Sequence, residues 1–203
     1  MALMQTLSDN FNDNSINTAI WDADNATESG GQLSISLSTG QGTFNGLYSD
    51  STYDLTASYA HVQLVSAGSL AVNTAELYPV ELYDATQSDY LYWALEYASD
   101  ELVAYKIDGS LSELYRVAYN SSTHAWLRIR EASGTIYFDS STDGLNWTNR
   151  ASTTVGFAVT ALHGAMDATN PSSGSTTAVF DNWNVTPSVA NLRRYTLTTL
   201  GVG

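Results

Sequence analysis

The sequence predicts an all-β protein folded as a sandwich or barrel, and three observations carry this prediction. Strand-like runs recur at spacings near ten residues along the 203-residue chain, separated by Gly, Asn, Asp and Ser. No segment shows a clear helical period, and the nearest candidate, residues 94–103, fits two strands joined by a turn about as well. In the segment Trp126–Trp147, period-two alternation is interrupted by Gly134 and by Asp143-Gly144, which is typical of an antiparallel meander.

Each expected strand is a β-prone run that ends at turn-forming residues. In chain order the strands are Leu33–Leu37, Phe44–Tyr48, Tyr59–Val65, Ala75–Tyr83, Tyr90–Tyr97, Leu102–Ile107, Leu114–Tyr119, Trp126–Glu131, Thr135–Ser140, Val155–Leu162 and Thr177–Val185. The segment Asp167–Ser175 has the composition of a polar loop. A chain of this length can bury one sizeable core, so we expect a single compact domain over residues 1–186.

Alternation within the central strands divides them into a core side and an outer side. The odd positions predict the core: Leu91, Trp93, Leu95, Val103, Tyr105, Ile107, Tyr115, Val117, Leu127, Ile129, Ile136 and Phe138. The even positions would place Tyr90, Tyr92, Lys106, Arg116, Arg128, Arg130 and Tyr137 together on the other side of the same sheet. Aromatic rings stack on sugars and Arg pairs with carboxylates, so this face is a candidate for binding an acidic or neutral glycan or an acidic protein.

The alternative for this face is an ordinary solvent-exposed surface. Glu96 and Asp139 share its parity, and cross-strand ion pairs of that kind contribute only about 0.2–1 kcal/mol each. Under the binding hypothesis, Arg128 and Arg130 contact the partner.

The charge distribution limits the classes of molecule that the protein can bind. Residues 1–186 hold all 21 acidic residues and five basic ones, a net charge of −16, whereas residues 187–203 carry +2. A strongly acidic body argues against nucleic-acid binding, since affinity for phosphate depends on Lys and Arg. The absence of Cys excludes disulfides and thiol chemistry. The N-terminal segment predicts no secretion signal, and no run approaches the roughly 20 apolar residues of a membrane span.

Three landmarks resemble the concanavalin A-like (laminin G-like) jelly-roll superfamily. They are the opening Asp9-Asn10-Phe11 with Ile20-Trp21, the Trp126–Trp147 meander, and the closing strand Val179–Val185. The resemblance covers roughly residues 7–186 and implies a two-sheet antiparallel jelly-roll sandwich in which the first and last strands lie side by side, bringing Phe11 near Trp183. Folds of this type often carry calcium at the rim, for which Asp9, Asp13 and Asp181 are the nearest candidates.

The tail after Pro187 leads to a second resemblance. Arg193, Arg194, Tyr195 and Leu197 lie in a β-prone stretch that ends in Gly-Val-Gly. Together with a Cys-free jelly roll and no secretion signal, this stretch is similar in style to bacteriophage virion proteins, which implies a docking arm over residues 187–203. Such an arm could add to a sheet edge of another virion protein or of another copy of this chain. The alternative is a disordered tail.

The sequence offers little for catalysis. A glycoside hydrolase needs two carboxylates about 5–9 Å apart, but Glu81 and Asp84 point to opposite faces of one strand and Glu96 has no acidic neighbour at two residues. His61, His124 and His163 are in no metal-binding spacing. We therefore assign no catalytic residue, metal or cofactor at this stage.

These expectations combine into a non-catalytic virion structural protein, a capsid decoration or tail component assembled in the host cytoplasm. Its lectin-like surface would contact host glycans, and neither nucleic acid nor membrane is expected as a partner. A free carbohydrate-binding module or lectin is the first alternative, and a glycan-cleaving enzyme is the second.

Overall fold

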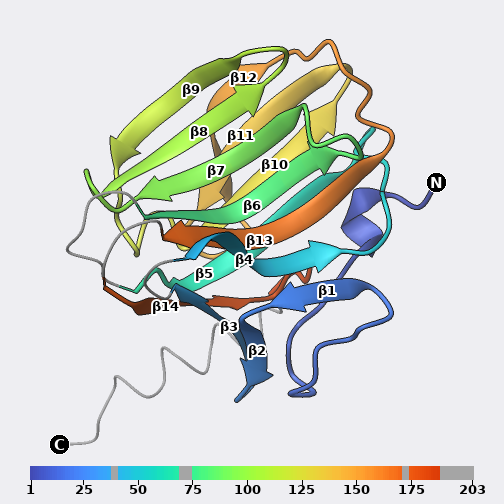
Figure 1. Ribbon diagram of the computed structural model, residues 1–203. Coiled ribbons are helices and arrows are strands. Elements are labelled where there is room, and N and C mark those ends of the chain that lie inside the picture. The colour runs from blue at the N-terminus through green and yellow to red at the C-terminus, as the bar shows by residue number, and fades with distance from the viewer. Residues whose placement is uncertain (38–40, 69–74, 171–173, 188–203) are drawn as a thin grey trace, which may run out of the picture.

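The protein is a sandwich of two antiparallel sheets, each with seven strands (Figure 1). The computed structural model describes residues 1–37, 41–68, 75–170 and 174–187, with only the backbone described at 41–44. Apart from the single 3₁₀ turn η1 (Met4–Thr6), the regular structure of the described residues is all strand. The predicted all-β jelly-roll sandwich is therefore confirmed. None of the described helical structure is long and apolar enough to cross a membrane.

The first sheet has the order β1-β4-β13-β6-β7-β8-β9, and the second has the order β12-β11-β10-β5-β14-β3-β2. The strands of the first sheet are β1 (Trp21–Asp24), β4 (Gln41–Ser49), β13 (Leu162–Asn170), β6 (Glu76–Asp84), β7 (Tyr90–Glu96), β8 (Glu101–Ile107) and β9 (Leu111–Ala118). Those of the second are β12 (Trp147–Thr153), β11 (Thr135–Ser141), β10 (Trp126–Ala132), β5 (Tyr59–Ser66), β14 (Thr176–Asp181), β3 (Gln32–Leu37) and β2 (Ala26–Ser29).

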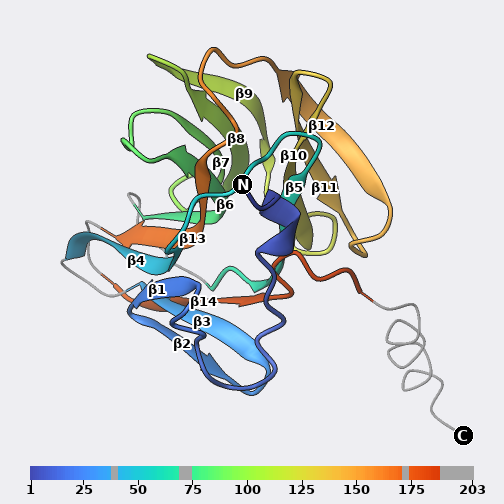
Figure 2. The same ribbon diagram turned by 90° about the vertical axis from the view of Figure 1, so that its right-hand side faces the viewer.

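The core lies between the two sheets. In Figure 2, β6–β9 form one side of the molecule and β10–β12 the other. Trp93 of β7 is fully buried and its ring meets that of Phe138 of β11, with centroids 5.7 Å apart. The same indole donates a hydrogen bond from Nε1 to the carbonyl oxygen of Arg128 in β10, at 3.1 Å. The Trp93 indole therefore packs between the two sheets, and its N–H group has a hydrogen-bond acceptor.

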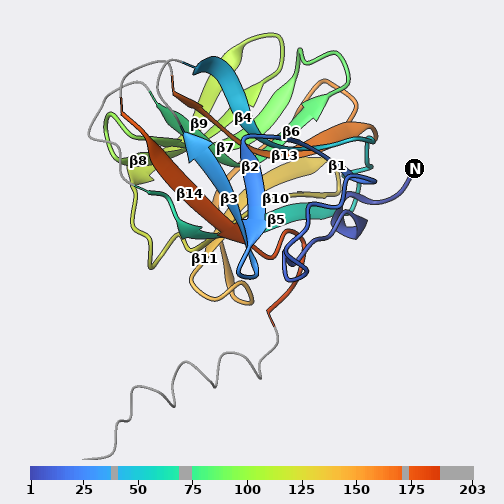
Figure 3. The same ribbon diagram turned by 60° about the horizontal axis from the view of Figure 1, so that its bottom comes forward.

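The opening and closing segments of the chain lie side by side. Asp9 forms an isolated antiparallel bridge with Trp183, and β14 lies beside β3, which pairs with β2 (Figure 3). Trp21 and Trp183 meet edge to face, with ring centroids 5.8 Å apart. The neighbouring Asn184 is buried, and its amide donates to the carbonyl oxygens of Met4 and Leu7. This arrangement agrees with the jelly-roll expectation for the first and last strands.

Replacing Asn184 with Ala is expected to lower the free energy of unfolding by about 2–4 kcal/mol. Its side chain also accepts from the backbone N–H of His61, so three backbone groups would each lose a hydrogen bond, and of these the Met4 carbonyl oxygen keeps one from the N–H of Leu7. Urea unfolding measures the change. The exposed Asn146 provides a control, since Asn146→Ala should shift stability by less than about 1 kcal/mol. A near-neutral Asn184→Ala variant would contradict the proposed role of this side chain.

Several predicted boundaries were wrong. Residues 155–161 are not a strand, and β13 begins at Leu162 and runs to Asn170, so Asp167 lies in a strand and not in a polar loop. Strands β1, β2 and β12 were absent from the expected set. They are short and contain Asp, Asn, Ala or Glu, which are depleted in strands, so cross-strand pairing and not local propensity determines them.

The assumption that odd positions form the core throughout was also wrong. Tyr92 pairs with Tyr105, so an even residue of β7 shares a face with an odd residue of β8. The core residues of β8 are accordingly Leu102 and Ala104, whereas Tyr105 lies on the outer face. Register determines which parity faces inward, and alternation within one strand does not reveal it.

The predicted arm lies outside the described residues. Arg193, Arg194, Tyr195 and Leu197 all fall within residues 188–203. The division of the chain into a body of residues 1–186 and a docking arm of residues 187–203 therefore stays a prediction.

Candidate active site

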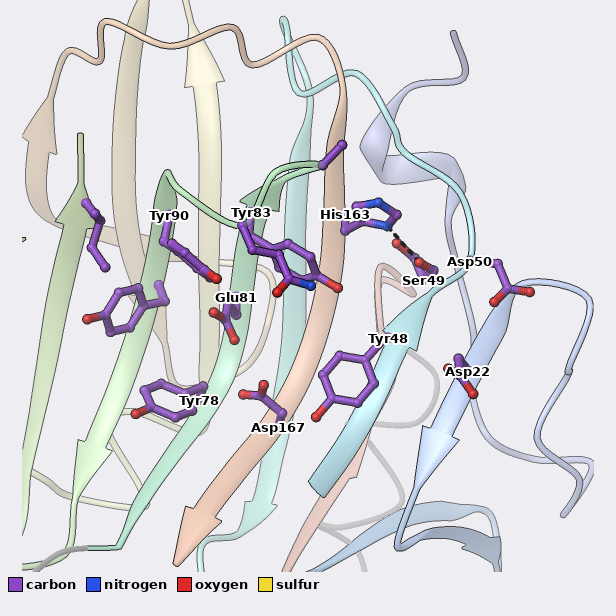
Figure 4. A pocket seen from close by; sticks show the side chains of 14 residues that line it. Asp22, Tyr48, Ser49, Asp50, Tyr78, Glu81, Tyr83, Tyr90, His163 and Asp167 are labelled. Carbon is purple, nitrogen blue, oxygen red and sulfur yellow. Dashed lines mark hydrogen bonds between the residues drawn. The ribbon is translucent and has the colours of Figure 1, made fainter. Parts of the chain in front are cut away.

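A pocket of about 730 Å³ opens on the outer face of the first sheet (Figure 4). Strands β1, β4, β13, β6 and β7 contribute side chains to it, together with the turn after β6 and the end of β8. Its lining is unusual in composition, because it combines four acidic residues with five tyrosines and one histidine.

Two carboxyl groups, Glu81 of β6 and Asp167 of β13, face each other in this pocket (Figure 4). Glu81 pairs with Ala165 on the neighbouring strand, so Asp167 is its diagonal neighbour on the same face. The exposed fraction is 8% for Glu81 and 3% for Asp167. A buried carboxyl pair without a facing cation is costly for the fold, which makes it a candidate functional site.

The protonation of the pair follows from its burial. Burial raises the pKa of Glu81 to about 7, and a hydrogen bond with Asp167 opposes that rise. Burial also raises the pKa of Asp167 well above its ordinary value, and the charge of Glu81 and the same hydrogen bond raise it further. Near neutral pH the two carboxyl groups therefore hold at least one proton between them, as expected for like charges in contact. The Oδ1 atom of Asp167 is buried without a hydrogen-bond partner.

A bulge in β6 brings Glu81 to the outer face. Pairing with β13 shifts between Ala165 and Asp167, where three steps along β6 oppose two along β13. Pro79 lies at this irregularity, where a missing backbone N–H costs least. Because of the bulge, Tyr78 and Glu81 lie on the same face although their positions differ in parity.

Gly46 of β4 provides the space for Asp167. The two residues are cross-strand partners, and a Cβ at Gly46 would lie 2.4 Å from both the Cβ of Asp167 and the carbonyl oxygen of Met166. No side chain larger than hydrogen fits at that position without movement of β13.

The tyrosines form a continuous aromatic surface beside the carboxyl pair. Ring centroids lie 5.5 Å apart for Tyr78 and Tyr92, 5.8 Å for Tyr83 and Tyr90, and 5.3 Å for Tyr92 and Tyr105. Burial raises the pKa of Tyr78, Tyr83 and Tyr92, so these phenols stay protonated. They can therefore offer ring faces for stacking and hydroxyl groups for hydrogen bonding.

His163 lies at the opposite side of the pocket from Tyr90. Its Nδ1 is 2.8 Å from the carbonyl oxygen of Ser49, and its ring stacks on Tyr83 with centroids 5.2 Å apart. A carbonyl oxygen only accepts hydrogen bonds, so Nδ1 carries the proton and Nε2 is the acceptor of the neutral ring. Ser49 is itself held, since its hydroxyl donates to Ser51 and accepts from the backbone N–H of Gly164.

The structure divides the predicted binding residues between the two sheets. Tyr90 and Tyr92 line the pocket on the first sheet, whereas Arg128, Arg130 and Tyr137 lie on the second. The prediction of one shared face was therefore wrong. The meander Trp126–Trp147 and the strands before it belong to opposite layers, which the alternation alone does not indicate.

Within the described residues, the predicted arginines have internal partners. Arg116 pairs with Glu96, Glu101 and Glu113 at 2.7–2.8 Å on the first sheet. Lys106 lies near Asp108, at 3.8 Å, and donates to the carbonyl oxygen of Thr154.

On the second sheet, Arg128 and Arg130 both donate to Oδ2 of the buried Asp139. Arg128 also lies over the ring of Trp147, at 4.2 Å, and Arg130 over that of Tyr137, at 3.9 Å. These contacts neutralise a buried carboxylate and account for the arginines structurally. Binding of a partner or glycan by Arg116, Arg128, Arg130 and Tyr137 stays a prediction.

Of the suggested calcium candidates, Asp13 and Asp9 lie near the buried Glu28, whose pKa is raised by burial and by these two acids. The carboxylate of Asp9 accepts hydrogen bonds from the backbone N–H of Phe11 and from Nε1 of Trp21. Burial raises the pKa of Asp181 to about 6. Across the part of the chain that the structure describes, no group of three or more Asp, Glu or His side chains is arranged to hold a metal ion.

Comparison with known proteins defines the fold. No family model matches the sequence, and no curated protein matches it. Among solved structures, a β-1,3-1,4-glucanase (lichenase) from a mouse hindgut metagenome superimposes with a TM-score of 0.63 at 8% identity, over 87% of this chain and 97% of that one. The β-glucanase of Bacillus licheniformis gives 0.61 at 13% identity, over 87% and 96%. The GH43 protein BlXynB of the same species gives 0.63 at 18% identity, over 87% of this chain and 38% of its own.

These neighbours establish the concanavalin A-like jelly-roll fold that the three sequence landmarks indicated. They also overturn the expectation of a non-catalytic protein, because glycoside hydrolases recur among the structures that share the fold. Nothing among them supports a bacteriophage virion protein. At these identities the likeness establishes the fold alone, and the support for an activity comes from the residues of the pocket.

Sequence reasoning missed the central pair of this pocket. Glu81 was paired only with acids of its own strand, and Asp167 was placed in a loop. The sequence offered no clear signal, because Leu162–Thr169 contains Gly, Ala and Asp, which are depleted in strands, and its residues are buried almost without alternation.

Proposed function

We propose that this protein is a glycan-cleaving enzyme that hydrolyses an uncharged glycan in the pocket on the outer face of the first sheet. The observation that carries the proposal is the buried carboxyl pair Glu81–Asp167. A fold gains nothing in stability from two carboxyl groups that face each other without a cation, so their retention is best explained by chemistry. The glycoside hydrolases among the structural neighbours support the same class of reaction.

Glu81 is the proposed general acid. Because its pKa is raised to about 7, it remains largely protonated under mildly acidic conditions. A protonated carboxyl group can give its proton to the glycosidic oxygen as the bond to the anomeric carbon breaks. Asp167, in contact with Glu81, holds the second exchangeable proton of the pair and positions the acid.

The charge of the pocket favours an uncharged substrate. Its charged lining consists of Asp22, Asp50, Glu81 and Asp167, and neither Lys nor Arg lines it. An acidic sugar would meet repulsion there without a cation to offset it. The tyrosine rings supply stacking surfaces that need no charge on the ligand.

The test is a comparison of polymers. Neutral polysaccharides, including β-1,3-1,4-glucan, and an acidic polymer such as polygalacturonate are incubated with the wild type, and new reducing ends are counted. We expect cleavage of at least one neutral polymer and none of the acidic one. Tyr83→Ala should weaken the cleavage, because Tyr83 stacks with both Tyr90 and His163 in the pocket. Cleavage of the acidic polymer alone would contradict the proposal.

The hypothesis of a role in a virion is separate from the proposed glycan cleavage. Incorporation into a virion and self-association rest on residues 187–203 and on the similarity in style to bacteriophage virion proteins, whereas contact with a host glycan rests on the lectin-like surface of the sandwich. Of that segment, residues 188–203 lie outside the described residues, so this hypothesis stays a prediction.

A further inference from the structure

The carboxyl pair alone does not complete a hydrolytic site. Glycosidases that act through two separate groups place them about 5–5.5 Å apart when configuration is retained and about 6.5–9.5 Å apart when it is inverted. Glu81 and Asp167 are in contact and share a hydrogen bond, so they behave as one proton-holding unit. The group that activates water must therefore be another residue of the pocket.

His163 occupies a suitable position. Glu81 pairs with Ala165, and His163 lies two residues before Ala165 on the same outer face of β13. His163 is thus a diagonal neighbour of Glu81 on the side opposite to Asp167, and the Cα atoms of such neighbours are about 7–8 Å apart. Tyr83 is the cross-strand partner of His163, and all three side chains line the pocket.

The hydrogen bonding of His163 prepares it to accept a proton. Nδ1 donates to the carbonyl oxygen of Ser49, so the lone pair of the neutral ring is on Nε2. Stacking on Tyr83 fixes the plane of the ring. An imidazole whose tautomer and plane are both set by neighbours is the usual form of a catalytic base.

Resting on the proposed function, we infer that His163 is the general base of this site and that hydrolysis inverts the configuration of the anomeric carbon. Water gives a proton to Nε2 of His163 while its oxygen forms the new bond to the anomeric carbon. The bond from that carbon to the glycosidic oxygen breaks, and the leaving oxygen takes the proton of Glu81. The site ends with an imidazolium and a carboxylate, which return to their starting forms by exchange of one proton.

Two variants separate base catalysis from a structural role. In His163→Asn, the amide Nδ2 takes the place of Nδ1 and keeps the hydrogen bond to Ser49, but the base is lost. In His163→Ala, both the hydrogen bond to Ser49 and the base are lost. We expect both variants to stay folded and to lose about 10²–10⁴-fold in kcat on a neutral glycan. Added imidazole should restore part of the activity of His163→Ala.

Rescue by imidazole gives a readout that a structural role would not produce, since a small base can replace the lost proton acceptor but cannot restore lost packing. The activity of the wild type and of both variants should fall as the pH rises through the range near 7 in which Glu81 loses its proton.

The configuration of the product tests whether hydrolysis inverts the anomeric carbon. Proton NMR of the first product should show the inverted anomer. A retained anomer, or a His163→Asn variant with nearly wild-type kcat, overturns the assignment of His163 while cleavage that depends on Glu81 leaves the proposed function standing. A wild type that cleaves no neutral glycan overturns both.

Discussion

Replacing Glu81 with Gln is expected to lower turnover on a neutral glycan by about 10²–10⁴-fold and, at the same time, to make the protein more stable above pH 7. The loss of activity follows from removal of the proposed acid. The gain in stability follows from burial, because an ionised Glu81 has no facing cation in the pocket. A residue that is costly to the fold and necessary for turnover is the signature of a functional site.

The sign of the pH effect can be derived from the raised pKa. The pKa of Glu81 is about 7 in the folded protein, whereas an unfolded Glu titrates at roughly 4.3. The folded state therefore binds more protons between these values, and stability falls as pH rises through that range. For Glu81 alone the loss is on the order of 3 kcal/mol by pH 8. Glu81→Gln should abolish most of this slope.

Urea unfolding at pH 5 and pH 8 measures the effect. Glu113→Gln is the matched control, since Glu113 is exposed, pairs with Arg116 on β9 and does not line the pocket. The control should keep both the wild-type activity and the wild-type pH slope. A Glu81→Gln variant that is less stable than the wild type at pH 8, or that remains fully active, would show that the pair is structural.

Replacing Gly46 with Ala is expected to cost about 1–3 kcal/mol of stability and most of the activity. The new Cβ would lie 2.4 Å from the Cβ of Asp167 and from a backbone oxygen of the same strand, so β13 must move. Moving Asp167 separates it from Glu81 and removes the contact that holds the acid. Shifts of this size at a catalytic group commonly cost about 10²-fold in rate.

Gly156→Ala is the control for this change. A Cβ there meets only the flexible carboxylate of Asp108, at 3.3 Å, so the substitution should be close to neutral. Thermal unfolding and the reducing-end assay compare the two variants. If Gly46→Ala were as stable and as active as Gly156→Ala, the close packing of Gly46 against Asp167 would not matter for the site.

The sequence predicted the layered fold because its signals are local. The turn at Gly134 joins β10 to β11 in the register that alternation implies, with Trp126 opposite Ser141. The opening and closing landmarks also meet as expected, through the bridge between Asp9 and Trp183. These features depend on period-two patterning and turn residues, both of which a single sequence displays.

The site was not predicted because it depends on register between strands that are far apart in the chain. Glu81 and Asp167 are 86 positions apart, and only the pairing of β6 with β13 makes them neighbours. The Pro79 bulge then changes which parity of β6 faces outward. Neither the pairing nor the bulge leaves a distinct pattern along one strand.

The same reasoning explains the error over the arginines. Arg116, Arg128 and Arg130 share parity along the chain, but Arg116 belongs to the first sheet and the other two to the second. A sandwich has two outer faces, and parity cannot distinguish them. The prediction that the tyrosines of β7 face outward was correct, and Tyr90 and Tyr92 line the pocket together with residues of β6 and β13.

The most direct test of this account is an NMR titration of the side-chain carboxyl carbons of Glu81 and Asp167, assigned with Glu81→Gln and Asp167→Asn. The account predicts that the pair still holds a proton near pH 7, with Glu81 titrating near that pH and Asp167 ionising well above its ordinary range. Two carboxyl groups that both ionise near pH 4 would contradict the shared proton, and with it the acid on which the proposed reaction depends.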